Sequence, residues 1–107
     1  MKTIRQGDIL LQQVEAAPRT ARTVPAENGR VILAHGEVTG HHHSLAAGTA
    51  VLLETEAGER FLQLKKPAPL EHQEHAPHYL QENEIYRVLR QREFAPEAPG
   101  LSRRVLD

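Results

Sequence analysis

The sequence predicts an all-β fold, a small β-barrel or β-sandwich, and two observations lead to this class. Short apolar runs alternate with turn residues at intervals of roughly eight to twelve positions, which is the strand spacing of such folds. Prolines and glycines recur along the chain and interrupt any long helix. At 107 residues the chain has the common size of one domain. We therefore expect a single β domain over residues 1–107, in which residues 96–107 form an extended tail.

The first predicted strands lie in the N-terminal third. Residues 8–14 form a short apolar run after Gly7, and this length fits a buried strand better than a helix. Residues 15–30 contain two prolines and a glycine among polar residues, so we expect a long irregular loop there. Residues 31–34 are aliphatic and are predicted to form a strand that ends at His35.

A β-hairpin is the most distinct element of the second half. Residues 50–56 and 60–65 both have strand character, and Gly58 lies where the chain must reverse. Residues 85–89 are predicted to form a further strand. A helix capped by Asn83 is the alternative there, because three apolar residues would share one helical face.

The segment 70–78 is predicted to be extended. Prolines lie on both sides of its acidic and histidine-rich centre, and a residue before proline is biased away from helical geometry. In an extended segment His72 and Glu74 share one face, whereas in a helical turn His72 and His75 lie together. Either conformation presents an imidazole and a carboxylate from this segment.

Composition excludes several classes of function. Thirteen lysines and arginines oppose fourteen acidic residues, so the chain lacks the basic excess of a typical nucleic-acid-binding protein. Two phenylalanines, two tyrosines and no tryptophan disfavour a base-stacking platform. Because cysteine is absent, a transition-metal site must use imidazole, carboxylate and water. The N-terminus has no apolar leader and no segment could span a membrane, so we expect a cytoplasmic protein.

Histidine is the residue type that points to a site. All seven histidines lie between His35 and His78, and three of them are consecutive. In a strand, side chains alternate between the two faces, so His41 and His43 point one way and His42 the other. Two imidazoles two residues apart can chelate one ion at the roughly 2.0–2.1 Å typical of zinc–nitrogen bonds.

The leading hypothesis is a site for zinc, manganese or iron. His41 and His43 are expected to supply two ligands and the segment 70–78 the rest. A bound metal would lower the pKa of its water to about 7 and allow hydrolysis of a small molecule or a phosphoester. The proposed ligands are His41, His43, His72, His75 and Glu74, with Glu71 or Glu74 as a fourth ligand or as the acceptor that fixes an imidazole tautomer.

Two alternatives remain open at this stage. The first is a metal-independent endoribonuclease, in which histidines act as general base and general acid and an arginine or lysine stabilises the developing charge. The second is a non-catalytic binding module. An exposed edge strand in so small a fold also favours pairing into a homodimer. The catalytic candidates are His41, His43, His75 and Arg92, with Arg5, Lys65, Lys66, Arg87 and Arg90 as further cations and Tyr79 and Tyr86 as proton donors or stacking groups.

Part of the chain resembles the cupins, small β-barrels whose first motif contains a glycine, His-x-His, a glutamate and a later glycine. Gly36, His41, His43 and Gly48 correspond to that motif. The glutamate is missing, since alanines and Gly48 occupy the positions where it belongs, and only a histidine in the 72–78 region could fill the place of the second motif. The resemblance implies a metal-binding barrel.

Four segments are similar to a group of small uncharacterised bacterial and phage proteins. They are Arg5-Gln6-Gly7-Asp8, the run from Gly36 to His41, Glu74-His75-Ala76-Pro77, and Tyr86-Arg87-Val88 with the charged residues that follow. This resemblance spans most of the chain outside residues 15–30 and attaches no activity to it. It implies that the site includes Arg5, Asp8, His41, His75 and Arg92.

Overall fold

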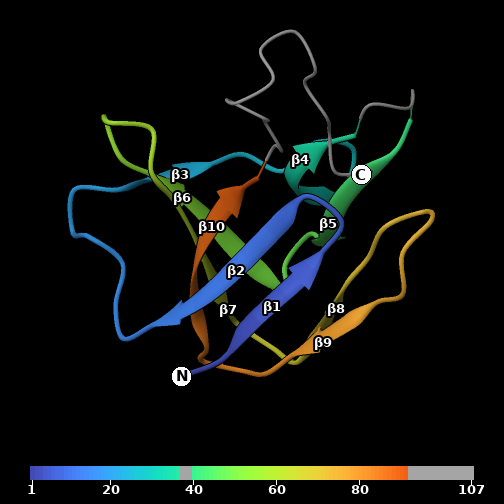
Figure 1. Ribbon diagram of the computed structural model, residues 1–107. Coiled ribbons are helices and arrows are strands. Elements are labelled where there is room, and N and C mark those ends of the chain that lie inside the picture. Colours follow the sequence, from blue (N-terminus) through green and yellow to red (C-terminus); the bar gives the residue numbers. More distant parts are fainter. Residues whose placement is uncertain (37–39, 92–107) are drawn as a thin grey trace, which may run out of the picture.

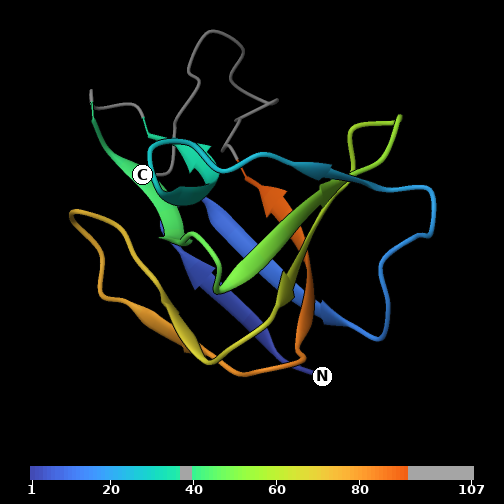
Figure 2. The ribbon, with the colours of Figure 1, turned by 180° about the vertical axis from the view of Figure 1, so that it is seen from behind.

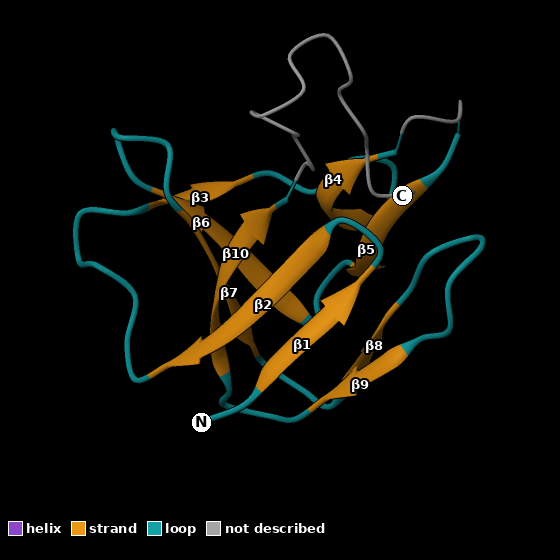
Figure 3. Cartoon of the chain, in the orientation of Figure 1, coloured by secondary structure: helices purple, strands orange, loops and turns teal. Residues whose placement is uncertain are grey.

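The predicted all-β class is confirmed by the computed structural model, which describes residues 1–36 and 40–91. These residues form ten strands, and none of them is helical (Figure 3). The part of the chain that is described therefore contains no helix able to cross a membrane. The predicted tail at residues 96–107 lies outside the described residues.

Six of the strands form one antiparallel sheet, and four form two separate two-stranded ribbons (Figures 1 and 2). The sheet order is β1 (Thr3–Gln6), β2 (Ile9–Val14), β10 (Ile85–Arg90), β7 (Arg60–Leu64), β6 (Ala50–Glu54) and β3 (Arg22–Val24). One ribbon pairs β4 (Arg30–His35) with β5 (His42–Ala46), and the other pairs β8 (Ala68–Leu70) with β9 (His78–Leu80). Two backbone hydrogen bonds between Ser44 and Glu71 join the ribbons to each other.

Most predicted strands are present close to their expected bounds. The hairpin is β6 and β7, paired from Ala50–Leu64 to Glu54–Arg60. Residues 85–89 form a strand, as predicted, and not the alternative helix. They belong to β10, which pairs with both β2 and β7 in the middle of the sheet. Segment 70–78 is a loop between the short strands β8 and β9, not a helix.

Two parts of the sheet differ from expectation. Residues 15–30 are not entirely irregular, because they contain β3, whose three residues pair with the outer edge of β6. Strand β1 was not expected, since its four residues are mostly polar and its apolar alternation is too short to recognise. It forms because Gly7 adopts a positive φ of 56° and lets the chain turn back on itself, so that β1 pairs with β2 from Gln6–Ile9 onward.

The apolar core draws on the sheet and on both ribbons. Its largest members are leucines that are at most 1% exposed: Leu11, Leu33, Leu45, Leu52, Leu62, Leu64, Leu70 and Leu80. Tyr86 also lies in this core, where its hydroxyl donates a hydrogen bond to Glu84 Oε1 at 2.6 Å. Burial and the neighbouring Glu84 raise the pKa of Tyr86, so its hydroxyl stays protonated. Because strands from all three units contribute, the ribbons are held firmly against the sheet.

Substitution of Gly58 measures how much the left-handed geometry of the hairpin turn matters for stability. Its φ is +89° and a Cβ added there would meet no atom within 4 Å, so backbone strain alone opposes substitution. We expect Gly58→Ala to lower the free energy of unfolding by about 1 kcal/mol. Gly58→Asn should cost less, because asparagine tolerates left-handed geometry better than alanine. Urea denaturation measures both, and equal losses would contradict this account.

Candidate functional site

Four of the seven histidines gather where the two ribbons meet. His43 lies on β5 and His41 directly precedes that strand, while His72 and His75 lie in the loop between β8 and β9. The ring of His72 is central. Its centroid lies 4.4 Å from that of His43, 4.6 Å from that of His75 and 5.6 Å from that of His41. We call these four residues the histidine cluster.

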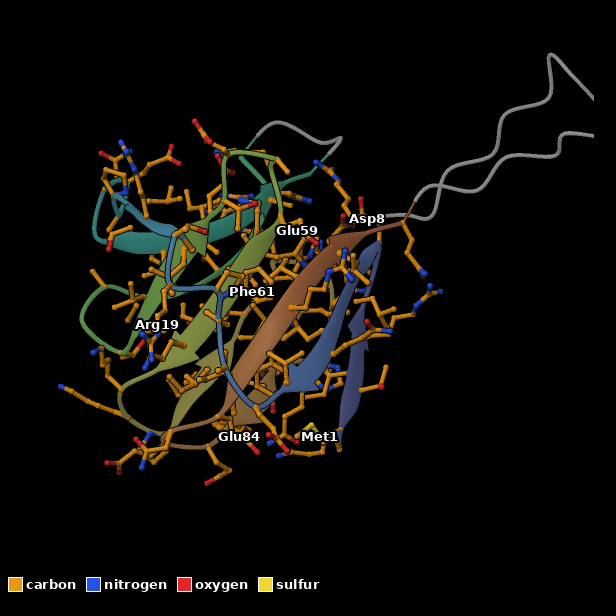
Figure 4. All side chains as sticks on the ribbon, turned by 90° about the vertical axis from the view of Figure 1, so that its left-hand side faces the viewer. Met1, Asp8, Arg19, Glu59, Phe61 and Glu84 are labelled. Carbon is orange, nitrogen blue, oxygen red and sulfur yellow. The ribbon has the colours of Figure 1, made fainter. Side chains whose placement is uncertain are left out.

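His43 is fully buried, and both of its ring nitrogens face a polar side chain. Nδ1 lies 2.8 Å from Gln6 Oε1, and Nε2 lies 3.1 Å from Asp8 Oδ1. Asp8 is also buried, and its Oδ2 accepts a hydrogen bond from Arg90 Nε at 2.7 Å. We call Gln6, Asp8, His43 and Arg90 the buried network. Figure 4 shows Asp8 at one end of the sheet, with Glu84 at the other.

Gln6 determines the orientation of the His43 ring. Its amide nitrogen donates to Leu70 O at 2.9 Å and to Ala76 O at 3.0 Å, which uses both amide hydrogens. The amide oxygen therefore faces His43, and Nδ1 of His43 carries the hydrogen. Since Leu70 and Ala76 lie on either side of His72 and His75, Gln6 also fastens both ends of the loop that presents these two histidines.

Burial keeps His43 neutral against the effect of Asp8. It lowers the pKa of His43 to about 4, and His72 acts in the same direction, while Asp8 opposes both. With the hydrogen of the neutral ring on Nδ1, the Nε2 lone pair lies opposite Asp8 Oδ1, which can only accept, so this contact opposes the neutral form. Both nitrogens are directed at network partners. His43 therefore positions its neighbours and does not present a nitrogen to a ligand.

His72 and His41 lie side by side, and of these two rings only His72 has its tautomer fixed by a hydrogen bond. His72 Nδ1 accepts from the backbone N–H of Glu74 at 3.0 Å, so the hydrogen of the neutral ring is on Nε2. His41 Nδ1 lies 3.0 Å from Glu74 Oε1, an ion-pair distance without hydrogen-bond geometry. The carboxylate favours a hydrogen on Nδ1 of His41, which would leave the lone pair on Nε2.

The cluster as it stands does not fit a divalent metal ion. Among the described residues, no three histidine or carboxylate side chains are arranged to hold one. The tautomers explain why, since an imidazole binds a metal through a nitrogen lone pair. His43 directs both nitrogens at Gln6 and Asp8, and the lone pair of His72 accepts the Glu74 amide. The predicted pairing of His41 with His43 as ligands has no support in this geometry, and the bound zinc, manganese or iron stays a prediction.

A hollow of about 250 Å³ lies beside the cluster, on the other face of β5. Its lining includes Arg30, whose guanidinium donates to Ser44 Oγ at 3.0 Å and to Glu71 Oε1 at 2.8 Å. Ser44 Oγ lies 2.8 Å from His42 Nδ1. Ser44 Oγ accepts from Arg30 and can donate its own hydrogen to His42 Nδ1, which would leave the His42 hydrogen on Nε2. The complete lining of this Arg30 pocket is Arg30, His42, Ser44, Glu71, His72 and Gln73.

The lining of the Arg30 pocket combines the Arg30–Glu71 ion pair with neutral imidazoles. Burial and the nearby Arg30 lower the pKa of His42, which keeps this imidazole neutral at pH 7. His72 closes the side of the pocket that adjoins the histidine cluster. The guanidinium and the imidazoles can donate to an anion such as a phosphate, whereas the Glu71 carboxylate opposes one.

Residues 5–91 match a protein family described as a domain of unknown function, DUF8820. The chain belongs to this family. The DUF8820 segment begins directly before Gln6 and ends directly after Arg90, so it contains the whole buried network, the histidine cluster and the Arg30 pocket. No curated protein and no solved structure matches the chain.

The structure of this DUF8820 protein brings together most of the predicted site residues. Both His72 and His75 belong to the cluster, although the metal-site hypothesis needed only one of them as a ligand. Glu74 Oε1 lies 3.0 Å from His41 Nδ1, so its predicted role beside an imidazole stays a prediction, whereas Glu71 pairs with Arg30. Arg92 lies outside the described residues.

Two of the remaining candidates have partners away from the cluster. Tyr86 is buried and bonded to Glu84, and Arg87 pairs with Glu59 at 3.0 Å on the surface of the sheet. Sequence reasoning missed Gln6 and Arg30 as site residues. Gln6 lies in the segment Arg5-Gln6-Gly7-Asp8, which resembles the small bacterial and phage proteins, but only Arg5 and Asp8 of that segment were predicted to belong to the site. No signal in the sequence marked Arg30.

Proposed function

We propose that the protein cleaves phosphodiesters that carry a neighbouring hydroxyl group, as RNA does, by metal-independent histidine catalysis. The observation that carries this proposal is the pair of adjacent imidazoles beside the Arg30 pocket, His72 with its hydrogen on Nε2 and His41 next to the Glu74 carboxylate. A small substrate is favoured over a long nucleic acid, because the chain has neither a basic excess nor several aromatic faces.

The Arg30 pocket is the place for the phosphate. Arg30 is held by Ser44 and Glu71, so its guanidinium is oriented before a ligand arrives. The imidazoles of His42 and His72 line the pocket together with it. His72 would act as an electrophile without changing its protonation state, since a neutral imidazole can polarise a substrate oxygen.

His41 is the proposed proton carrier. Its Nε2 lone pair takes the proton from the neighbouring hydroxyl, whose oxygen attacks phosphorus as the bond from phosphorus to the leaving oxygen breaks. The protonated His41 then returns that proton to the leaving oxygen, which departs as an alcohol. The products are a cyclic phosphate and a free hydroxyl end, and Glu74 stabilises the imidazolium in between.

A ribonucleotide dimer tests this proposal in the presence of EDTA. We expect a 2′,3′-cyclic phosphate product from the wild-type protein and none from a 2′-deoxy substrate. His41→Ala should lower the rate by about a hundredfold or more, the usual contribution of a general base. Glu74→Gln should have a smaller effect, because it leaves the imidazole in place. His78→Ala, on β9 and outside the pocket, is the matched control and should retain the wild-type rate.

Other results would favour the other hypotheses. Loss of cleavage in EDTA that zinc or manganese restores, together with metal found by elemental analysis of untagged protein, would replace this proposal with the metal site. An absence of cleavage under all conditions, with phosphate still bound at the Arg30 pocket, would favour a non-catalytic binding module.

A further inference from the structure

A second pocket, separate from the histidine cluster, lies between β4 and the sheet. Its volume is about 300 Å³, at the lower end of the range for small-molecule sites. Ile9 on β2, Leu33 on β4 and Val88 on β10 line it, and each is at most 8% exposed. These three side chains come from three strands and present an apolar surface to whatever occupies the space. We call this the β4 pocket.

Two arginines of the lining are held in place by the backbone of β4. Arg60 Nη1 donates to Leu33 O at 2.6 Å, and Arg90 Nη2 donates to His35 O at 2.6 Å. Arg90 is also bonded to Asp8 from behind. Guanidinium groups held this way lose little side-chain freedom when a ligand binds, so they are prepared for an anion.

The backbone of β4 is irregular at this point. The register between β4 and β5 shifts between Ile32 and Ala34, which leaves Leu33 as an extra residue in the ladder. Such bulges re-aim side chains and carbonyls and are over-represented beside functional sites. Here the bulge directs the Leu33 carbonyl to Arg60 and buries the Leu33 side chain in the pocket wall.

The charges of the lining select among anions. Arg60 is paired with Glu54 at 3.2 Å and Arg90 with Asp8 at 2.7 Å, and the lining also contains Glu27, which lies 3.6 Å from His35 Nε2. Three carboxylates therefore balance the two guanidinium groups, so a dianionic phosphate is disfavoured more strongly than a monoanion that accepts from the remaining guanidinium N–H groups. The apolar residues also favour a ligand with a hydrocarbon part over a fully polar ion. We infer that the β4 pocket binds the carboxylate of a short aliphatic acid, with the carboxylate at Arg60 and Arg90 and the hydrocarbon against Ile9, Leu33 and Val88.

Titration of the full chain with acetate, butyrate and valerate, followed by amide NMR shifts, tests this inference. We expect saturable shifts at Leu33, Ala34 and Val88, with affinity rising by about fourfold for each added methylene. Inorganic phosphate should bind more weakly than valerate. Equal affinity across the three acids, or tighter binding of phosphate, would overturn the inference.

Charge variants separate this pocket from a general surface effect. Arg60→Gln should weaken valerate binding about tenfold, whereas Glu27→Gln should strengthen it, because it removes a like charge at a well-exposed position. Arg87→Gln is the matched control, since Arg87 lies on β10 three residues from Arg90, on the opposite face of the strand. An equal loss in Arg60→Gln and Arg87→Gln would count against the site. Neither Arg60 nor Arg87 lines the Arg30 pocket, so the outcome for these two variants is independent of the proposed cleavage reaction, whereas the charge of Glu27 also acts on His42.

Discussion

Asp8→Ala is expected to lower the free energy of unfolding by about 3 kcal/mol, the lower end of the cost of removing one partner from a buried charged pair. The carboxylate of Asp8 is 3% exposed and serves two partners. Without it, Arg90 Nε loses an acceptor, and Nε2 of the fully buried His43 faces a cavity. Urea denaturation at pH 7 measures the loss.

Asp8→Asn is the matched variant, and it tests the protonation state of the network. The asparagine oxygen can still accept from Arg90, and its amide nitrogen can donate to the lone pair of a neutral His43. We therefore expect a loss of no more than about 1 kcal/mol, because Arg90 keeps its acceptor and the amide N–H replaces the unfavourable contact between the carboxylate and the Nε2 lone pair. If Asp8→Asn is as damaging as Asp8→Ala, His43 is not the neutral Nδ1–H tautomer.

The strands with a clear apolar pattern were predictable. The β6–β7 hairpin and β10 both have enough aliphatic residues to show strand character, and Gly58 marks the turn between the first two. Strand β1 has no such pattern, because its order depends on pairing with β2 and on burial of a polar residue, Gln6. A short polar strand is recognisable only once its partner is known.

The gathering of histidines was also predictable, but their chemistry was not. Residue type and alternation place His41 and His43 near the segment 70–78. The tautomers depend on contacts that span almost the whole chain. Gln6 bonds a carbonyl 64 residues away, and Asp8 bonds Arg90 82 residues away. A glutamine carries no signal in the sequence that it will be buried, so the reason His43 is directed away from a metal could not be seen there.

The role of Arg30 was likewise not predictable from the sequence. It lay in the segment expected to be irregular, yet it begins β4 and reaches across the ribbon to Ser44 and Glu71. Its position depends on the pairing of β5 with residue 71, a contact between two ribbons that no local pattern predicts.

Acidification is expected to destabilise the protein well above the range in which most carboxylates titrate. The pKa of His43 is lowered from 6.5 to about 4 by burial, so the unfolded chain binds a proton more readily than the folded one. The stability that folding gains by keeping His43 neutral is complete above pH 6.5 and is lost progressively as the pH falls towards 4. At about 1.4 kcal/mol for each pKa unit, the full loss is roughly 3 kcal/mol. The pKa of His42 is lowered as well and adds a loss of the same sign.

His43→Gln isolates the contribution of His43. Glutamine fits a buried polar position and does not titrate, so its unfolding free energy should change less than that of the wild type between pH 7 and 4.5. His42 is present in both proteins, and its contribution cancels in the comparison. The groups that face His43 are Asp8, His72 and His75, and of these Asp8 favours its protonated form. If Asp8 outweighed burial, the pKa of His43 would lie above 6.5, and the wild type would gain stability relative to His43→Gln as the pH fell. Parallel curves for the two proteins would mean that folding does not change the protonation of His43.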